Sequence, residues 1–419
     1  MFEPLKGLRV IDTSHVLAGP YAGYQLALLG ADVIKIEVPG IGDWTRKGGQ
    51  LPELNEAGMG LSFMSQNAAK RSLALDIKTP EGRDILKRLT ANADVFIENM
   101  RPGTMVRNGL GYEDMKAVKP DLIYCSISAF GQDGPYSRRG AYDHVIQGMC
   151  GIMGTTGTRE SGPTKVGAPY VDFATGLNAA YAISAALHQR RVTGEGVHLD
   201  VAMLDTSMML MASLLTSHLS SGWKPEPAGN EAWSRSPTSG CFQTSDGLLM
   251  VAANNIRQIV PLLETLGLTE LADKARRDPL AARDELNGLR PTLVAVLKTR
   301  AASEWEDDLN AVGVPAGRVR NLAEMLAEEH AAARQLTTPI EAVPGTTVHV
   351  PTAGFKANGA AIAPTTPAPR LGEHSREVLG ELGLSDGEID ALVSGNIVGT
   401  AEETGDRPPA SPSAGFARV

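Results

Sequence analysis

Cysteine is scarce in this chain. Its 419 residues contain three, Cys125, Cys150 and Cys241, and no two of them form a Cys-x-x-Cys pair. Three scattered cysteines are too few for a disulfide framework. We therefore interpret them as small buried side chains in a reducing compartment.

Basic residues are also in deficit. The 39 Lys and Arg residues are outnumbered by 48 Asp and Glu residues, giving a formal net charge of −9. Binding to nucleic acid requires a basic face that displaces counterions, so we expect no nucleic-acid partner.

Targeting segments and membrane spans are missing as well. The first residues lack the basic and apolar regions of a signal peptide. The longest charge-free stretch, residues 206–223, is dotted with Ser and Thr and contains His218, which favours a core helix over a membrane span. We expect a cytoplasmic protein without a membrane partner.

Several catalytic signatures are absent. The sequence has neither a His-Glu-x-x-His motif nor a Gly-x-Ser-x-Gly elbow, so we predict no metal site and no serine hydrolase. The turn at residues 18–23 contains Gly19 and Gly23 but has Pro20 between them, so the dinucleotide fingerprint is incomplete. A nicotinamide oxidoreductase is therefore a weak alternative.

What the first half does contain is an alternation of short apolar runs and helical patterns, typical of a parallel α/β sheet. A helix is predicted from Pro20 to Gly30 with the proline at its first position, and Thr79 should cap another helix that begins with Pro80. Ligands bind at the carboxyl ends of such strands. The predicted strands are residues 8–12, 32–37, 72–76, 94–98, 121–127 and 197–203.

The second half indicates a separate, smaller domain. A Pro- and Gly-rich linker at residues 222–240 precedes a predicted hairpin at 241–253 and a mostly helical stretch. Ser303 and Glu306 have the spacing of a capping box, as do Ser385 and Glu388. Residues 337–369 are predicted to be loop-rich, and residues 399–419 a disordered tail.

Residues 98–107 follow a strand and begin a helix, which places backbone amides together with Arg101 and Arg107 near one edge of the sheet. Arginine forks and helix N-termini suit phosphate oxygens, and Lys78 lies near another strand end. A phosphate site and a solvated helix with surface arginines are both consistent with this pattern.

Asp172 precedes an apolar helical pattern over residues 177–190 and is placed like an N-cap. The helix amides and dipole should then stabilise its anion and lower its pKa. Such an aspartate can simply cap the helix, or it can act as a nucleophile towards an acyl carbon. His15 and His144 are candidate bases, although isolated histidines more often pack or hydrogen-bond.

Taken together, these motifs resemble the class III CoA-transferase family, which includes formyl-CoA transferase and carnitine CoA-transferase and is related to α-methylacyl-CoA racemase. The resemblance extends to about Val398. It is carried by residues 7–12, 15–20, 28–37, 67–72, 75–82, 98–103, 131–136, 172–176 and 371–374.

The resemblance implies that Asp172 is the catalytic nucleophile, which forms an aspartyl anhydride and then an aspartyl thioester. It also implies an acyl-CoA and a small carboxylic acid as substrates, with no tightly bound cofactor. The residues implied to line the coenzyme A (CoA) site are His15, Ala18, Leu75, Lys78, Asn99, Met100, Arg107 and Tyr142, and Arg101 is expected to join the phosphate contacts.

The same resemblance implies an interlocked homodimer with a large doubly wound, Rossmann-like α/β domain and a smaller inserted α+β domain. The linkers are compatible with a large domain of residues 1–225 plus 330–398 and a small domain of residues 226–329.

Two departures from formyl-CoA transferase bear on the substrate. Leu17 stands where that enzyme has a glutamine, and Val38 stands where it has an arginine, so we expect an acceptor acid other than oxalate. One alternative is a 2-methylacyl-CoA racemase that uses Asp172 with His144 or Tyr142. Tyr142 occupies the position of the racemase histidine and would be a poor base near neutral pH. A non-catalytic acyl-CoA-binding protein is a weaker alternative.

Overall fold

A computed structural model describes residues 2–232 and 234–401, which form two compact units. The first unit contains the described residues up to and including Cys150, Val166–Thr216, and those from Arg334 onwards. The second contains Gly151–Lys165 and Ser217–Ala333. The assignment of domains to residues 1–225 plus 330–398 and to residues 226–329 stays a prediction.

The first unit is organised around a seven-stranded sheet in the order β14-β3-β2-β1-β4-β5-β6. All neighbouring strands are parallel except β14, which pairs antiparallel with β3. The predicted α/β fold class is confirmed. Without β14, the order is that of doubly wound dinucleotide-binding sheets. The strands are β1 (Arg9–Asp12), β2 (Asp32–Glu37), β3 (Arg71–Leu75), β4 (Val95–Glu98), β5 (Ile123–Ser128), β6 (Val197–Ala202) and β14 (Val398–Gly399).

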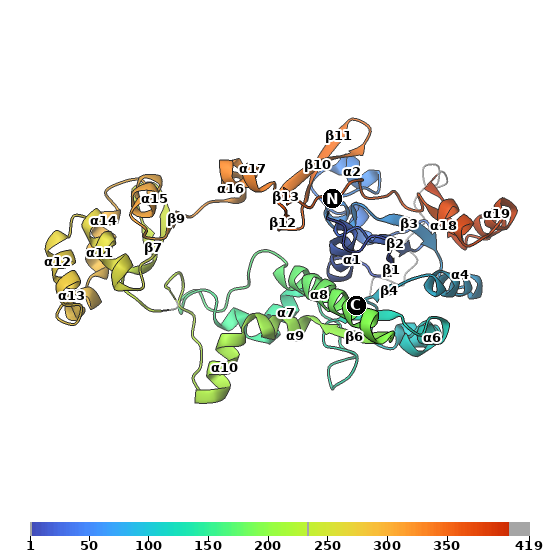
Figure 1. The fold of residues 1–419 in the computed structure, drawn as a ribbon, viewed down its shortest axis with the longest axis horizontal. Coiled ribbons are helices and arrows are strands. Elements are labelled where there is room, and N and C mark those ends of the chain that lie inside the picture. The colour runs from blue at the N-terminus through green and yellow to red at the C-terminus, as the bar shows by residue number, and fades with distance from the viewer. Residues whose placement is uncertain (1, 233, 402–419) are drawn as a thin grey trace. The chain divides into compact units, whose positions relative to one another are not determined.

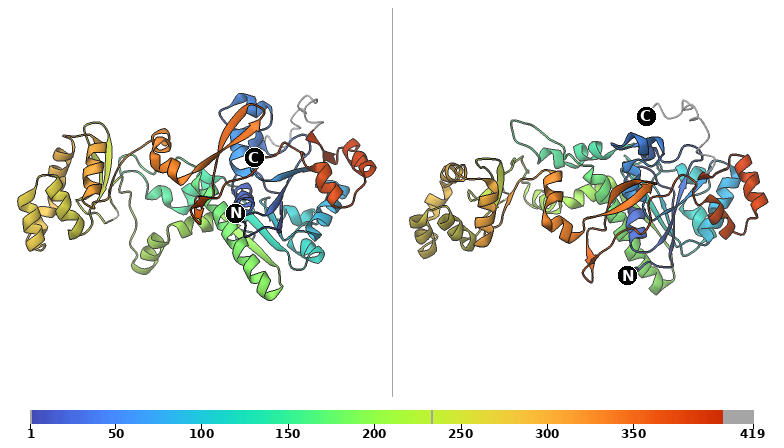
Figure 2. Two further views of the ribbon diagram at one scale, coloured as in Figure 1. Left: turned by 45° about the horizontal axis from the view of Figure 1, so that its top comes forward. Right: turned by 90° about the horizontal axis from the view of Figure 1, so that it is seen from above.

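Helices cover both faces of this sheet, which explains its apolar strands: a parallel sheet buried on both sides needs near-continuous apolar runs. One face packs against α1 (Ala18–Leu28) and α8 (Tyr170–Thr193). The other face packs against helices from both halves of the sequence, which lie together in Figures 1 and 2. They are α4 (Pro80–Ala91), α6 (Tyr112–Val118), α18 (Ser375–Glu381) and α19 (Asp386–Ser394).

Two predicted caps are confirmed and two predicted helix starts are wrong. Thr79 accepts a hydrogen bond from the amide of Gly82, and Ser385 and Glu388 form a capping box. In contrast, α1 begins at Ala18, so Pro20 is its third residue. The helix α15 (Ala302–Ala311) begins before Ser303, and the amide of Ala301 donates to Glu304 instead.

Residues 337–369, predicted to be loop-rich, also contain four strands. They form the antiparallel pairs β10 (Thr337–Val343) with β11 (Thr346–Pro351), and β12 (Lys356–Ala357) with β13 (Ala360–Ala361). The first pair is stabilised by burying Val348 and Val350 against Tyr24 and Phe63, a partnership between distant segments that local sequence does not reveal. Gly399 belongs to β14 instead of the predicted tail, and residues 402–419 of that tail lie outside the described residues.

The second unit has its own core. Its sheet β7-β8-β9 (Ser239–Gln243, Leu248–Ala252 and Ala316–Arg318) packs against helices between residues 256 and 311. Gly151–Lys165 joins this unit through a hydrogen bond of 2.7 Å from the amide of Gly229 to the carbonyl of Gly157. Across the described residues, no helix combines the length and apolar character needed to cross a membrane.

Candidate active site

The strand order reverses between β1 and β4, and ligands of doubly wound sheets bind at such a point, beyond the carboxyl ends of the strands. His15 follows β1 and Asn99 follows β4. The amide of His15 donates to Asn99 Oδ1 at 2.9 Å, and Asn99 Nδ2 donates to the carbonyl of His15 at 2.7 Å. Burial, aided by the charge of Lys35, lowers the pKa of His15, so its imidazole is neutral at pH 7.

Met100 and Ala18 lie in the same region. The amide of Met100 donates to Glu98 Oε2 at 2.8 Å, and Ala18 is the buried first residue of α1. Glu98 is itself buried at the end of β4, and burial raises its pKa to about 7. The structure therefore brings together His15, Ala18, Asn99 and Met100, all of which were predicted for the CoA site.

The first turns of α8 pack directly against the first turns of α1. A Cβ atom added to Gly176 would lie 2.7 Å from the carbonyl oxygen of Ala18, so glycine permits this close approach. The ring of Phe173 contacts Tyr21 edge-on, with centroids 4.8 Å apart. Asp172 immediately precedes Phe173, so its helix turn adjoins the start of α1 and hence the crevice.

A buried carboxylate from another helix holds the start of α8. Asp143, the first residue of α7 (Asp143–Cys150), accepts hydrogen bonds through Oδ2 from the amides of Val171 at 2.8 Å and Asp172 at 3.2 Å. Its Oδ1 accepts from Gln147 Nε2 at 2.5 Å, and Gln147 Oε1 in turn accepts from the amide of Val166 at 2.8 Å. Asp143 thus takes the capping role that the sequence assigned to Asp172.

The predicted N-cap position and lowered pKa of Asp172 are both wrong. Pro169 is the N-cap residue and Asp172 is the third residue of α8. Burial, reinforced by the charge of Asp143, raises the pKa of Asp172 to about 7. Desolvation outweighs the favourable helix dipole here. A carboxylate with a raised pKa is more basic, and hence a stronger nucleophile once ionised.

The other predicted residues are spread along the same edge of the sheet. Leu75 is buried at the end of β3, and Lys78 is exposed just beyond it. Arg101 approaches Gly140 in the loop before α7, and Tyr142 immediately precedes Asp143. Arg107 ends the short helix α5 (Thr104–Arg107), where its Nη2 donates to Thr104 Oγ1 at 3.0 Å. The CoA-binding role of these residues stays a prediction.

Sequence reasoning missed Asp143 and Gln147. In the motif Tyr142-Asp143-His144, the sequence suggested Tyr142 and His144 as bases. The residue that contacts the start of α8 is instead the aspartate between them. The rings of Tyr142 and His144 are both on exposed residues and stack with centroids 6.3 Å apart. An aspartate at the start of a helix can be recognised from sequence as a candidate cap. That Asp143 caps α8 instead of its own helix could not be recognised.

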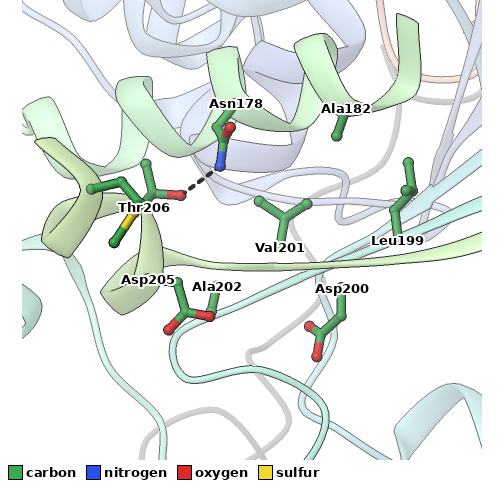
Figure 3. Close-up of a pocket in the computed structure, with 9 residues that line it drawn as sticks. Asn178, Ala182, Leu199, Asp200, Val201, Ala202, Asp205 and Thr206 are labelled. Atoms are coloured by element: carbon green, nitrogen blue, oxygen red, sulfur yellow. Dashed lines mark hydrogen bonds between the residues drawn. The ribbon is translucent and has the colours of Figure 1, made fainter. Parts of the chain in front are cut away.

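A separate cavity of about 200 Å³ lies between α8, β6 and α9 (Met203–Leu210). Figure 3 shows Asp200 and Asp205 on this cavity and the 3.1 Å hydrogen bond from Asn178 to Thr206. Within the described part of the chain, its lining includes none of the residues predicted for the CoA site.

This arrangement is a doubly wound α/β fold with an ionisable aspartate at a helix start, near the point where the strand order reverses. Residues 5–375 match the model of CoA-transferase family III, and the chain belongs to this family.

Its relatives include the succinate–glutarate CoA-transferase of Agrobacterium fabrum, 38% identical over 387 residues that cover 90% of this chain and 96% of the relative. The succinyl-CoA:glutarate CoA-transferase of Mus musculus is 35% identical, covering 94% of this chain and 90% of the relative. The crystal structure of a CAIB/BAIF family protein from Brucella suis superimposes with a TM-score of 0.77 at 35% identity, covering 91% of this chain and all of that chain (100%). The predicted family and enzyme class are confirmed, and CoA thioesters are the substrates of such enzymes.

Proposed function

We propose that this protein transfers CoA from a dicarboxylic acyl-CoA, with succinyl-CoA as the first candidate, to a second carboxylic acid such as glutarate. The names of the relatives from A. fabrum and M. musculus support this substrate class. The observation that carries the chemistry is the partly buried Asp172, whose raised pKa makes it a competent nucleophile at neutral pH.

In the proposed reaction, the Asp172 carboxylate attacks the thioester carbonyl, and the C–S bond breaks to release CoA thiolate and leave a mixed anhydride. The thiolate attacks the aspartyl carbonyl, which expels the donor acid and forms an aspartyl thioester. The acceptor carboxylate then displaces CoA thiolate to form a second anhydride. Attack of the thiolate on the acceptor carbonyl releases the new acyl-CoA and restores Asp172.

Asp143 supports this cycle by holding the backbone that carries Asp172. Its bonds to the amides of Val171 and Asp172 fix the first turn of α8, and its negative charge contributes to the raised pKa of Asp172. A positioned nucleophile needs less reorganisation during the reaction.

The direct test is covalent trapping. The protein is incubated with succinyl-CoA or other acyl-CoA esters, treated with hydroxylamine, digested and mapped by mass spectrometry. A donor-dependent hydroxamate on Asp172 is the expected result. If no adduct forms and deuterium instead enters the α-carbon of a 2-methylacyl-CoA, the racemase alternative is correct.

Replacing Asp143 by asparagine should shift the pH dependence of transfer. Asp172 must be ionised to attack, so kcat/KM rises with pH through its pKa of about 7. Asp143→Asn removes a neighbouring negative charge, and the midpoint should move to lower pH. The measurement is kcat/KM with succinyl-CoA and glutarate from pH 5 to 9. Asp205→Asn is the control, and an equal midpoint in Asp143→Asn and wild type would contradict the proposed coupling.

Arg107→Ala should weaken CoA binding because the guanidinium is proposed to contact a phosphate. Loss of one charge-assisted hydrogen bond costs about 1.5–3 kcal/mol, or roughly a tenfold to hundredfold increase in Kd. Calorimetry with CoA at low and high salt measures this effect. Arg191→Ala, in the last turn of α8, is the control. Equal affinity of Arg107→Ala and wild type at both salt concentrations would remove Arg107 from the site.

The homodimeric assembly and cytoplasmic location implied by the family resemblance stay predictions. Multi-angle light scattering of the purified protein tests the first, with twice the 44.3 kDa chain mass as the expected result.

A further inference from the structure

The segment between β1 and α1, residues 13–17, carries His15 and contains a strained residue. Val16 has a backbone φ of +74°. A β-branched side chain is strongly disfavoured in this left-handed region, so the conformation persists only where surrounding groups enforce it. Strained backbone of this kind often lies at functional sites, and here it directly follows His15.

Hydrogen bonds hold the backbone of the three residues that precede Val16. Thr13 donates through its amide and hydroxyl to the carbonyl of Ile97, at 2.9 and 3.0 Å. The carbonyl of Ser14 accepts from Lys35 Nζ at 2.7 Å, while its amide donates to Asp12 Oδ1 at 3.0 Å. The two hydrogen bonds between the backbone of His15 and the side chain of Asn99 hold the next residue in the same way.

Val16 itself is held by two buried side chains. Its amide donates to Asp43 Oδ2 at 3.0 Å, and its carbonyl accepts a hydrogen bond from Gln66 Nε2. Asp43 Oδ1 accepts from the amide and hydroxyl of Thr45, at 3.0 and 2.8 Å, so both carboxylate oxygens are engaged. Asp43 Oδ2 also lies 3.9 Å from His15 Nδ1 and 3.4 Å from Lys35 Nζ.

Asp43 belongs to a buried charge network, all of whose side chains are 3% exposed or less. Lys70 Nζ lies 2.8 Å from Asp12, and Arg46 Nη2 lies 2.6 Å from Glu37. Acidic and basic members balance in number, which offsets the cost of removing each charge from water. The members are Asp12, Lys35, Glu37, Asp43, Arg46 and Lys70.

We infer that Asp43 is a positioning residue for CoA thioester binding: its bond to the amide of Val16 enforces the strained turn that fixes His15 at the crevice. The inference rests on the proposed function, because it assigns His15 to the CoA site. Asp43 lies in the loop after β2, outside the strands of the sheet. Its hydrogen bonds go to Thr45 in its own loop and to the amide of Val16, and its Oδ2 also pairs with Lys35 Nζ.

The first experiment compares CoA affinity by calorimetry for wild type, Asp43→Asn and Asp94→Asn. Asparagine has only one side-chain oxygen, so it cannot accept the hydrogen bonds of both Thr45 and Val16. Asp43→Asn should therefore raise the Kd for CoA about tenfold or more. Asp94 pairs with Arg190 at 2.6 Å near the amino ends of the strands, so Asp94→Asn controls for loss of a partly buried ion pair. Unchanged affinity in Asp43→Asn would overturn the inference.

The second experiment asks whether Asp43 acts through the strained residue. Glycine adopts positive φ freely, so the turn should need less enforcement when Val16 is glycine. Asp43→Asn should therefore raise Kd much less in a Val16→Gly background than in wild type. An equal increase in both backgrounds would show that Asp43 does not act through Val16.

A stability comparison keeps the inference testable if Asp43→Asn does not fold. Val16→Gly should have a higher Tm than Val16→Ala, because alanine retains the positive-φ strain that glycine lacks. A lower Tm for Val16→Gly than for Val16→Ala would show that the backbone at residue 16 is not strained. Failure of the proposed function is separately visible: wild type would then neither bind CoA nor form the Asp172 adduct, irrespective of the order of these two Tm values.

Discussion

Asp172→Ala is expected to reduce CoA transfer at least about a thousandfold, because it removes the atom that is proposed to form the covalent intermediate. Binding of CoA should be largely retained, since the predicted phosphate contacts come from other side chains. Initial rates with succinyl-CoA and glutarate, together with calorimetry of CoA binding, measure the two effects separately.

A matched control lies on α9. Asp205 is the third residue of its helix, as Asp172 is of α8, and burial raises its pKa as well. Asp205→Ala therefore tests loss of a first-turn aspartate outside the crevice, and it should leave transfer near the wild-type rate. Wild-type activity in Asp172→Ala would disprove the nucleophile assignment, and equal losses in both variants would point to a general helix effect.

Lys70→Ala is expected to lower the free energy of unfolding by about 3–5 kcal/mol, since breaking a buried ion pair leaves an uncompensated charge. Lys70 Nζ donates to Asp12 Oδ2 at 2.8 Å, to the carbonyl of Pro20 at 2.7 Å and to Asn67 Oδ1 at 2.9 Å. Burial lowers the pKa of Lys70 to about 8, so urea denaturation should be measured at pH 7, where the amine is charged.

Lys119→Ala supplies the comparison for this measurement. Lys119 pairs with Asp121 at 3.0 Å, but the side chains are 29% and 37% exposed. Solvent screening limits such a pair to about 1 kcal/mol or less. If Lys70→Ala destabilised the protein no more than Lys119→Ala, the buried charge network would not contribute to stability as argued.

Local sequence predicted those features that depend on local chemistry. The segment from Asp32 to Glu37 forms a strand with the predicted bounds, and the caps at Thr79 and Ser385 use side chains within their own helix turns. The α/β class follows from the same alternation of strands and helices. Family resemblance then added Asp172 as the catalytic candidate.

What sequence did not predict depends on distant partners. The raised pKa of Asp172 arises from burial and from Asp143, which lies on another helix. Lys35 occurs in an apolar strand, and nothing local indicates that its amine reaches the carbonyl of Ser14. The positive φ of Val16 could not be predicted either. It depends on hydrogen bonds to Asp43 and Gln66, which are distant in the sequence.

The pairing of β14 with β3 also has a consequence for biosynthesis. Val398 pairs with Leu75, and a nearby hydrogen bond, from the amide of Ser72 to His374, joins residues 302 positions apart. During translation, β3 therefore remains an unpaired sheet edge until the whole second unit has been synthesised. Unpaired edges recruit strands from other chains. Nascent chains that stall before β14 should accordingly be more prone to aggregation than the complete chain.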